Sequence, residues 1–442
     1  MKIAFATLGC KVNQYDTATI ETALLGQGDA VVPFEAGADV YVINSCTVTD
    51  RADAESRQLV RRARRLNPAA RVILTGCFAQ TRPHDAGALH EVDYVIGVSR
   101  LPDVLRAVRG EVRADEGRVL VHNLRKATEV TTLGAEVFNG QTRAFLKVQE
   151  GCDLFCTFCI VPMARGRSRS VPPREVLRQI ERLAARGFKE VVLTGIHLGG
   201  YGEDLDAKLD IADLVEMIAE TSPVPRVRLS SLDPPEVTPR LLRLIAQSEI
   251  VCPHLHVPVQ AGEDSVLRRM RRLYDSAFLR EVAAEFACAL PSGGLSTDVI
   301  AGFPGESEAD FDATVELLEG LPFTYFHVFP YSKRTGTTAA KLADQVPRAE
   351  IERRARVLRR LGERKRREFA ARGLGAEHDV LVETTRDRES GLLAGYSRSY
   401  ARVLIDGPDS WMNSERRVRG ERLFGARIVA AGGEKEEQRV AV

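Results

Sequence analysis

The chain has 442 residues, of which 44% are hydrophobic and 28% charged, and its formal net charge is +1. These values exclude a disordered or fibrous protein, and the length indicates two or three domains. No uncharged apolar run approaches the roughly 20 residues that a membrane-spanning helix needs. The first residues are more typical of a strand than of a signal peptide. We therefore expect a cytoplasmic protein without a membrane partner.

The first 112 residues alternate between strand and helix patterns, which favours a doubly wound parallel sheet. The expected strands are 2–8, 39–44, 71–75 and 93–96, and the expected helices are 13–25 and 50–66. Cys10, Cys46 and Cys77 each follow one of the first three strands. Because the carboxyl ends of parallel strands meet at one edge of a sheet, these thiols can converge. The alternative for each cysteine alone is a small buried thiol.

Residues 113–137 lack sustained periodicity and predict a connector. From 138 to 372 the alternation resumes, with strands expected at 145–149, 190–193, 226–229, 254–258, 296–300 and 325–329. Six such units would make most of a β/α barrel. Between 345 and 372 there are 11 Lys or Arg and 4 Asp or Glu, net +7, on one long helix expected at 348–372. Short β-rich runs at 379–383, 392–405 and 421–429 predict a small all-β module over 373–442.

Three further cysteines are closely spaced, as Cys152-x3-Cys156-x2-Cys159, directly after an expected strand. Three thiolates at this spacing suit three irons of a [4Fe–4S] cluster and leave the fourth iron open to another ligand. The alternative is a zinc or redox site. Zinc prefers four ligands with paired spacing, and no second pair or suitable histidine follows.

The stretch GCDLFCTFCIVPMARGRSRS resembles the signature of the radical S-adenosylmethionine (SAM) methylthiotransferases. Asp153 and Met163 depart from the Asn and Tyr usual there. The resemblance implies that Cys152, Cys156 and Cys159 hold a [4Fe–4S] cluster whose open iron binds SAM. The reduced cluster would then cleave SAM to a 5′-deoxyadenosyl radical.

The resemblance extends over essentially the whole chain. TLGCKVNQYD, INSCTVT and LTGCFAQ resemble the amino-terminal domain of this family, which implies a second [4Fe–4S] cluster on Cys10, Cys46 and Cys77. The implied fold is a radical SAM core, a partial β/α barrel, over 138–372. The carboxy-terminal block resembles a TRAM domain, a small RNA-binding β-barrel.

Four later motifs also match the family: LTGIHLGGYG, RLSSLDP, HLHVPVQAGED and TDVIAGFPGE. They imply that SAM is contacted by Thr194, Gly195, Ser230, Ser231, Gln260, Asp298, Gly302, Pro304 and Gly305. For Gly302 and Gly305, simple turn geometry is the alternative. His197, His254 and His256 lie in the same loops, and we assign them no ligand role, because packing at a strand end accounts for them.

KVNQ after the first cysteine and FHVFPYSKRTGT resemble the family members that act on threonylcarbamoyladenosine at position 37 of tRNA. The implied reaction adds a methylthio group at carbon 2 of the adenine and uses two SAM molecules per turnover. The implied partners are the tRNA anticodon stem-loop and an external electron donor such as flavodoxin or ferredoxin; the sequence does not identify the sulfur donor.

Three alternatives remain open at this stage. Related enzymes act on isopentenyladenosine in tRNA or on a ribosomal-protein aspartate, and the subtype rests on resemblance alone. A protein of another class, a non-catalytic RNA-binding iron–sulfur electron carrier, would also use these cysteines and the basic helix. The helix at 348–372 and the Arg-rich segment 57–65 are the best candidates for contacts with phosphates.

Overall fold

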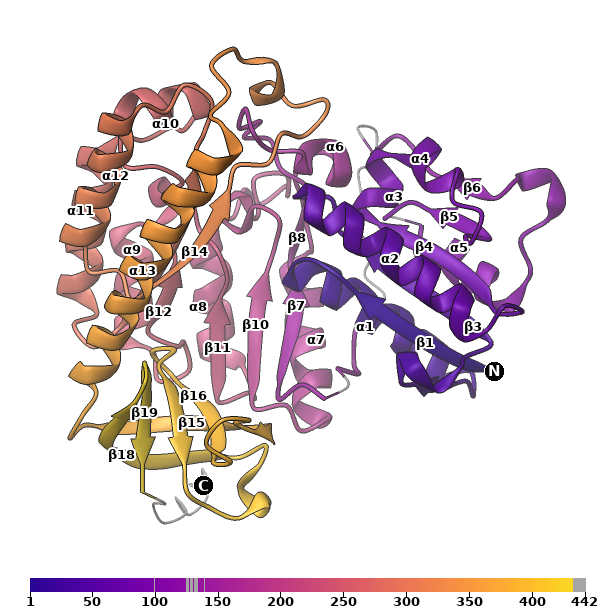
Figure 1. Cartoon of the computed structure of the whole chain (residues 1–442). Coiled ribbons are helices and arrows are strands. Elements are labelled where there is room, and N and C mark those ends of the chain that lie inside the picture. The colour runs from indigo at the N-terminus through magenta and orange to yellow at the C-terminus, as the bar shows by residue number, and fades with distance from the viewer. Residues whose placement is uncertain (99, 125–126, 128–129, 131–133, 139, 432–442) are drawn as a thin grey trace.

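The computed structural model describes residues 1–431 except 99, 125–126, 128–129, 131–133 and 139. The end of the predicted all-β module, 432–442, lies outside the described residues. In the described part, no helix has both the length and the apolar character needed to cross a membrane. The architecture is mixed α/β, with a parallel sheet, a core of parallel strands and a small barrel in chain order (Figure 1).

The first part of the chain forms a parallel sheet with strand order β2-β1-β3-β4-β5-β6. Its strands are β1 (Lys2–Thr7), β2 (Ala30–Val32), β3 (Val40–Ser45), β4 (Arg71–Gly76), β5 (Tyr94–Ile96) and β6 (Val119–Leu120). The four predicted strands correspond to β1, β3, β4 and β5. The edge strands β2 and β6 were not predicted, because two or three residues are too few to show a period. Strand β6 lies within the predicted connector.

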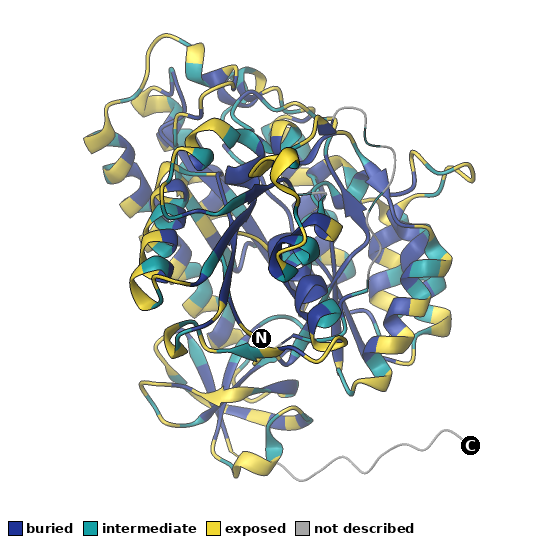
Figure 2. Ribbon diagram, turned by 90° about the vertical axis from the view of Figure 1, so that its right-hand side faces the viewer, coloured by how far each residue is buried: buried dark blue, intermediate teal, exposed yellow. Residues whose placement is uncertain are grey.

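Helices cover both faces of this sheet, as the doubly wound pattern predicted. The helices are α1 (Lys11–Leu25), α2 (Asp50–Leu66), α3 (Cys77–Thr81), α4 (Pro83–Gly87) and α5 (Leu101–Arg109). Alternate residues of each strand face opposite sides. Val40 and Val42 therefore pack with Ile20 of α1, whereas Tyr41 and Ile43 pack with Val60 of α2. Figure 2 shows the resulting buried strands between helices with exposed outer faces.

The core contains two three-stranded parallel sheets, β11-β10-β7 and β12-β13-β14. Parallel bridges from Val227 to Val251 and from Ser231 to His256 join them into one open, curved series of strands. The strands are β7 (Arg143–Lys147), β10 (Glu190–Thr194), β11 (Arg226–Leu229), β12 (His254–His256), β13 (Gly294–Ala301) and β14 (Tyr325–Pro330). All six were predicted, with ends shifted by at most two residues. They form the expected partial barrel.

Helices connect the core strands: α7 (Pro173–Ala185), α8 (Ile211–Thr221), α9 (Pro239–Gln247), α10 (Asp264–Met270), α11 (Ser276–Ala289) and α12 (Glu308–Gly320). Helix α1 of the first sheet packs beside the edge strand β7, and the basic helix α13 (Arg348–Arg372) packs beside the other edge strand, β14. Tyr15 of α1 donates a hydrogen bond of 3.0 Å to Gln179 of α7. The first sheet and α13 thus flank the open side of the core.

The carboxy-terminal strands close into a barrel with order β15-β16-β17-β19-β18. They are β15 (Glu377–Arg386), β16 (Leu393–Ser397), β17 (Arg402–Ile405), β18 (Glu415–Phe424) and β19 (Arg427–Ala430). The predicted run 392–405 is divided by a turn in which Tyr400 has a φ of +71°. Arg228 of β11 donates to the carbonyl of Arg398 at 2.8 Å and pairs with the buried Glu190. A buried charge network therefore fixes the barrel against the core.

Candidate functional site

The three dispersed cysteines converge at one edge of the first sheet. Cys10 precedes α1 after β1, Cys46 follows β3, and Cys77 begins α3 directly after β4. Gly9 has a φ of +102°, and a Cβ on it would lie 3.1 Å from the Cys46 sulfur. Only glycine permits so close an approach in this backbone conformation. The topology therefore brings together thiols that are far apart in sequence, as the strand pattern predicted.

A buried cation lies beside these cysteines. The side chain of Arg165, at the end of α6 (Val161–Arg165), is 1% exposed and forms ion pairs with Asp16 at 2.7 Å and Glu150 at 2.9 Å. Lys147 pairs with the same two carboxylates at 2.6 and 2.7 Å. Burial raises the pKa of Cys77 to about 12, and the positive charge of Arg165 opposes this rise. Arg165 thus favours a negatively charged group at the cysteines. The sequence does not show which of its many arginines is buried there.

The closely spaced cysteines occupy the loop between β8 (Gln149–Glu150) and α6. Arg272 donates a hydrogen bond of 2.9 Å to the Cys156 sulfur and pairs with Asp233 at 2.6 Å. Burial raises the pKa values of Cys152 and Cys159 to about 12. Thiols in such surroundings stay protonated unless a metal displaces the proton. Both cysteine groups therefore fit a metal cluster better than free reactive thiols. Sequence reasoning also missed Arg272.

A cavity of about 190 Å³ lies beside Cys159 of the core cysteine group. One wall contains Cys159 and its neighbour Phe158. Another contains Val48 and Thr49, which directly follow Cys46 and β3. Gln260 and Asp298, two of the predicted SAM contacts, complete its polar lining together with Tyr331 and Ser332. Residues that follow strand β3 of the first sheet and residues of the core thus line the same cavity.

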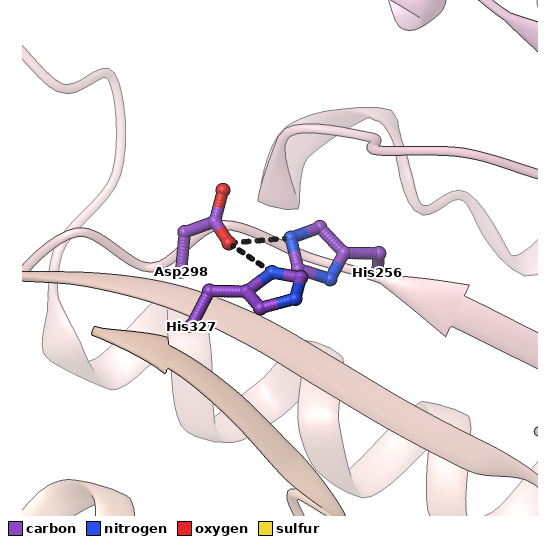
Figure 3. Close-up of side chains that lie close together, drawn as sticks. All are labelled: His256, Asp298 and His327. Carbon is purple, nitrogen blue, oxygen red and sulfur yellow. Dashed lines mark hydrogen bonds and ion pairs between the residues drawn. The ribbon is translucent and has the colours of Figure 1, made fainter. Parts of the chain in front are cut away.

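Asp298 also belongs to a cluster of three side chains from adjacent core strands (Figure 3). One of its carboxylate oxygens lies 2.9 Å from Nε2 of His256 and 3.0 Å from Nδ1 of His327. Burial alone would raise the pKa of Asp298, but the two imidazoles outweigh it and hold that pKa well below its usual range. His256, for which only packing at a strand end was predicted, is therefore a hydrogen-bond partner of a candidate site residue.

The other predicted SAM contacts lie outside the lining of this cavity. Thr194 ends β10 and is buried, Ser231 is bridged to His256, and Ser230 lines a second cavity. A Cβ on Gly195 would lie 2.9 Å from the Gln149 side chain, and one on Gly302 would lie 2.4 Å from Ile351. Gly302 and Gly305 both have a φ of +77°, and Pro304 lies buried between them. Turn geometry and close packing account for these glycines, and their contact with SAM remains a prediction.

Known proteins resemble the chain over most of its length. Residues 2–97 match the uncharacterized protein family UPF0004, and residues 146–318 match the Radical SAM superfamily. The chain is 40% identical to the threonylcarbamoyladenosine tRNA methylthiotransferase MtaB of Bacillus subtilis (strain 168), over 92% of this chain and 91% of that protein. The chain belongs to the radical SAM methylthiotransferase family. The resemblance inferred from the motifs is thereby confirmed.

Within this methylthiotransferase family, a relative with a different tRNA substrate in its name is less similar to the chain. The tRNA-2-methylthio-N(6)-dimethylallyladenosine synthase of Carboxydothermus hydrogenoformans is 32% identical over 91% of this chain and 92% of its own length. One similar solved structure is that of the radical SAM methyltransferase TsrM of Kitasatospora setae, bound to tryptophan and a SAM analogue. The similarity covers 87% of this chain and 79% of the TsrM chain. Its TM-score is 0.54 at 16% identity. That likeness shows the fold alone.

Proposed function

We propose that this protein methylthiolates carbon 2 of N6-threonylcarbamoyladenosine at position 37 of tRNA. The observation that carries the proposal is one cavity lined by Cys159 of the core group and by Val48 and Thr49, which follow Cys46 of the other group. The chain is also more similar to the threonylcarbamoyl enzyme than to the dimethylallyl one. A substrate base in that cavity would be within reach of both groups.

Each cysteine group would hold one [4Fe–4S] cluster, Cys152, Cys156 and Cys159 in the core and Cys10, Cys46 and Cys77 in the first sheet. When bound, the core cluster and SAM supply the one-electron chemistry that activates the unreactive ring carbon, and two SAM molecules would be used per turnover. Arg272 would stabilise the thiolate of Cys156 by its hydrogen bond. Arg165 would balance the negative charge of the thiolates in the first sheet, next to Cys77. Gln260 and Asp298 would position SAM beside Cys159.

The tRNA anticodon stem-loop is the macromolecular partner in this proposal. Arg359, Arg360 and Arg367 of α13 are exposed, and none has an ion pair with a residue that the structure describes. Such side chains can neutralise backbone phosphates. Two arginines of the carboxy-terminal barrel are less available, because Arg398 pairs with Glu415 and Arg416 lies over the Trp411 ring. An external donor such as flavodoxin or ferredoxin would supply electrons, in the cytoplasm.

The experiment supplies one anaerobically reconstituted preparation with two tRNAs, one carrying threonylcarbamoyladenosine and one carrying isopentenyladenosine at position 37. Nucleosides are then analysed by mass spectrometry. We expect the methylthio product from the first tRNA only. Conversion of the isopentenyl form alone would overturn the substrate assignment, and conversion of neither would favour a protein substrate or an electron carrier.

A further inference from the structure

A second cavity, of about 240 Å³, lies between the core strands, α13 and the carboxy-terminal barrel. Its lining, which belongs entirely to the described part of the chain, contains five cationic side chains and no carboxylate: Lys11, Arg143, Arg228, Arg366 and Arg402. In the first cavity the charged lining side chain is the carboxylate of Asp298, and no Lys or Arg of the described ranges lines it. The two cavities therefore differ in the sign of their charge.

The two cavities are neighbours inside the core. His256 and His327 line the second cavity, Asp298 lines the first, and their contacts form the partition between them (Figure 3). Along β14, Phe329 lines the first cavity and Tyr325 the second. Side chains on one face of a strand are about 6.6 Å apart, so these two lie about 13 Å apart with His327 between them. A modified nucleobase with an extended substituent spans such a length.

Two of the five cations in the second cavity lack ionic partners among the described residues, Lys11 and Arg366. In contrast, Arg143 pairs with Glu383 and Arg228 with Glu190. Arg366 lies over the ring of Tyr325, 5.3 Å from its centroid. Because α13 and α1 contribute one each, the two free cations approach the cavity from opposite sides of the open core.

The wall of the second cavity also contains polar atoms without partners. The hydroxyl of Ser230 and Nδ1 of His254 are buried and make no hydrogen bond with any residue that the structure describes. Both residues are only 5% exposed. Buried polar atoms are normally hydrogen-bonded, so an unpartnered pair in a cavity wall indicates a polar occupant. Burial would raise the pKa of the Tyr400 phenol, but Arg143 and Lys11 outweigh it and lower that pKa. The cavity therefore has an excess of positive potential.

We propose that the second cavity binds the carboxylate of the substrate's threonylcarbamoyl group, with Lys11 and Arg366 as the residues that select it. This inference rests on the proposed function. The threonylcarbamoyl group ends in a carboxylate and a hydroxyl, whereas an isopentenyl group is an uncharged hydrocarbon. The carboxylate would be repelled by Asp298 in the first cavity and attracted by the cations of the second. An unpaired cation in a buried site also disfavours a hydrocarbon substituent.

A backbone phosphate of tRNA is the other anion that could occupy such a cavity, and the experiment distinguishes the two. Three anticodon stem-loops are compared that differ only at position 37: threonylcarbamoyladenosine, its neutral methyl ester and unmodified adenosine. Their dissociation constants for the full-length, cluster-loaded protein are measured by fluorescence anisotropy without SAM, so that no turnover occurs. We expect the free acid to bind roughly tenfold more tightly than the ester, as for a hydrogen bond to a charged group.

The variants Lys11→Gln and Arg366→Gln should each reduce this acid-to-ester ratio several-fold and leave the dissociation constant of the unmodified stem-loop within about twofold. Arg243→Gln, which removes an exposed cation from α9 outside the cavity, should not change the dissociation constant of any of the three stem-loops. Equal binding of acid and ester by the unsubstituted protein would overturn the inference. So would equal weakening of all three stem-loops in the variants, which would identify a phosphate contact. Either result leaves the proposed function standing if the threonylcarbamoyl tRNA is still converted.

Discussion

The two cysteine groups of this protein are assembled in different ways. Cys152, Cys156 and Cys159 lie within eight residues of one loop, so their proximity is a local property of the chain. Cys10, Cys46 and Cys77 come from three strand ends and meet only when the parallel sheet has formed. The core group can therefore be recognised by spacing, whereas the other group can be recognised only through topology. It also follows that the second group is more sensitive to the integrity of the fold.

The largest expected effect concerns the local group. A variant with Cys152, Cys156 and Cys159 all changed to Ala should lose all formation of 5′-deoxyadenosine, because the proposed SAM-binding iron would be absent. Its iron content after anaerobic reconstitution should fall from about eight to about four per chain, that of one remaining cluster. Cys288→Ala, at an exposed cysteine of α11, is the matched control. An unchanged iron content in the triple variant would refute the ligand assignment.

Single changes in the dispersed group should separate the two halves of the reaction. In Cys10→Ala, Cys46→Ala or Cys77→Ala the core loop is untouched, so 5′-deoxyadenosine should still form. The methylthiolated nucleoside should become undetectable, because the proposed acceptor of the sulfur would be lost. Both products can be quantified in one assay by mass spectrometry. Normal methylthiolation by all three variants would exclude a second catalytic cluster.

The contact between the first sheet and the core should also contribute to the free energy of unfolding. Arg165 connects the two regions, because it pairs with Asp16 of α1 and with Glu150 of the core and donates to Asn13. Replacing it with Met leaves buried carboxylates without this partner, which costs about 3–5 kcal/mol. Arg165→Met should therefore lower the free energy of unfolding of the apo protein by about that amount in urea. Arg243→Gln serves as the control, and a loss below about 1 kcal/mol would show that Lys147 alone suffices.

The sequence predicted more of the fold than of the charge network. The alternation of strand and helix patterns identified every core strand, through runs such as 190–193 and 325–329, because β-branched and aromatic residues favour strands. The cysteine positions followed from spacing and strand order. Arg165 and Arg272 could not be found in this way, because a buried arginine and an exposed one have the same residue type and no periodic pattern separates them. Nor could the pairing of His256 with Asp298, which depends on the register between β12 and β13.

The smallest expected effect is a pH dependence at the junction between the two regions. Burial alone would raise the pKa of Glu150, but Lys147 and Arg165 outweigh it and hold that pKa below its usual range. A carboxyl group with a lowered pKa in the folded state stabilises the protein fully above its unfolded pKa, about 4.3. This contribution is lost as the pH falls from about 5 toward the lower, folded-state pKa.

The difference in unfolding free energy between the unsubstituted protein and Glu150→Gln should therefore be constant between about pH 6 and 7 and shrink below about pH 5. Glu316→Gln, at an exposed position of α12, should show no such trend. Urea unfolding of the apo proteins at several pH values measures both. A difference that grows as the pH falls would mean that Glu150 is protonated in the folded state. In that case Arg165 would be paired through Asp16 alone, and the junction would depend on the first sheet rather than on the core.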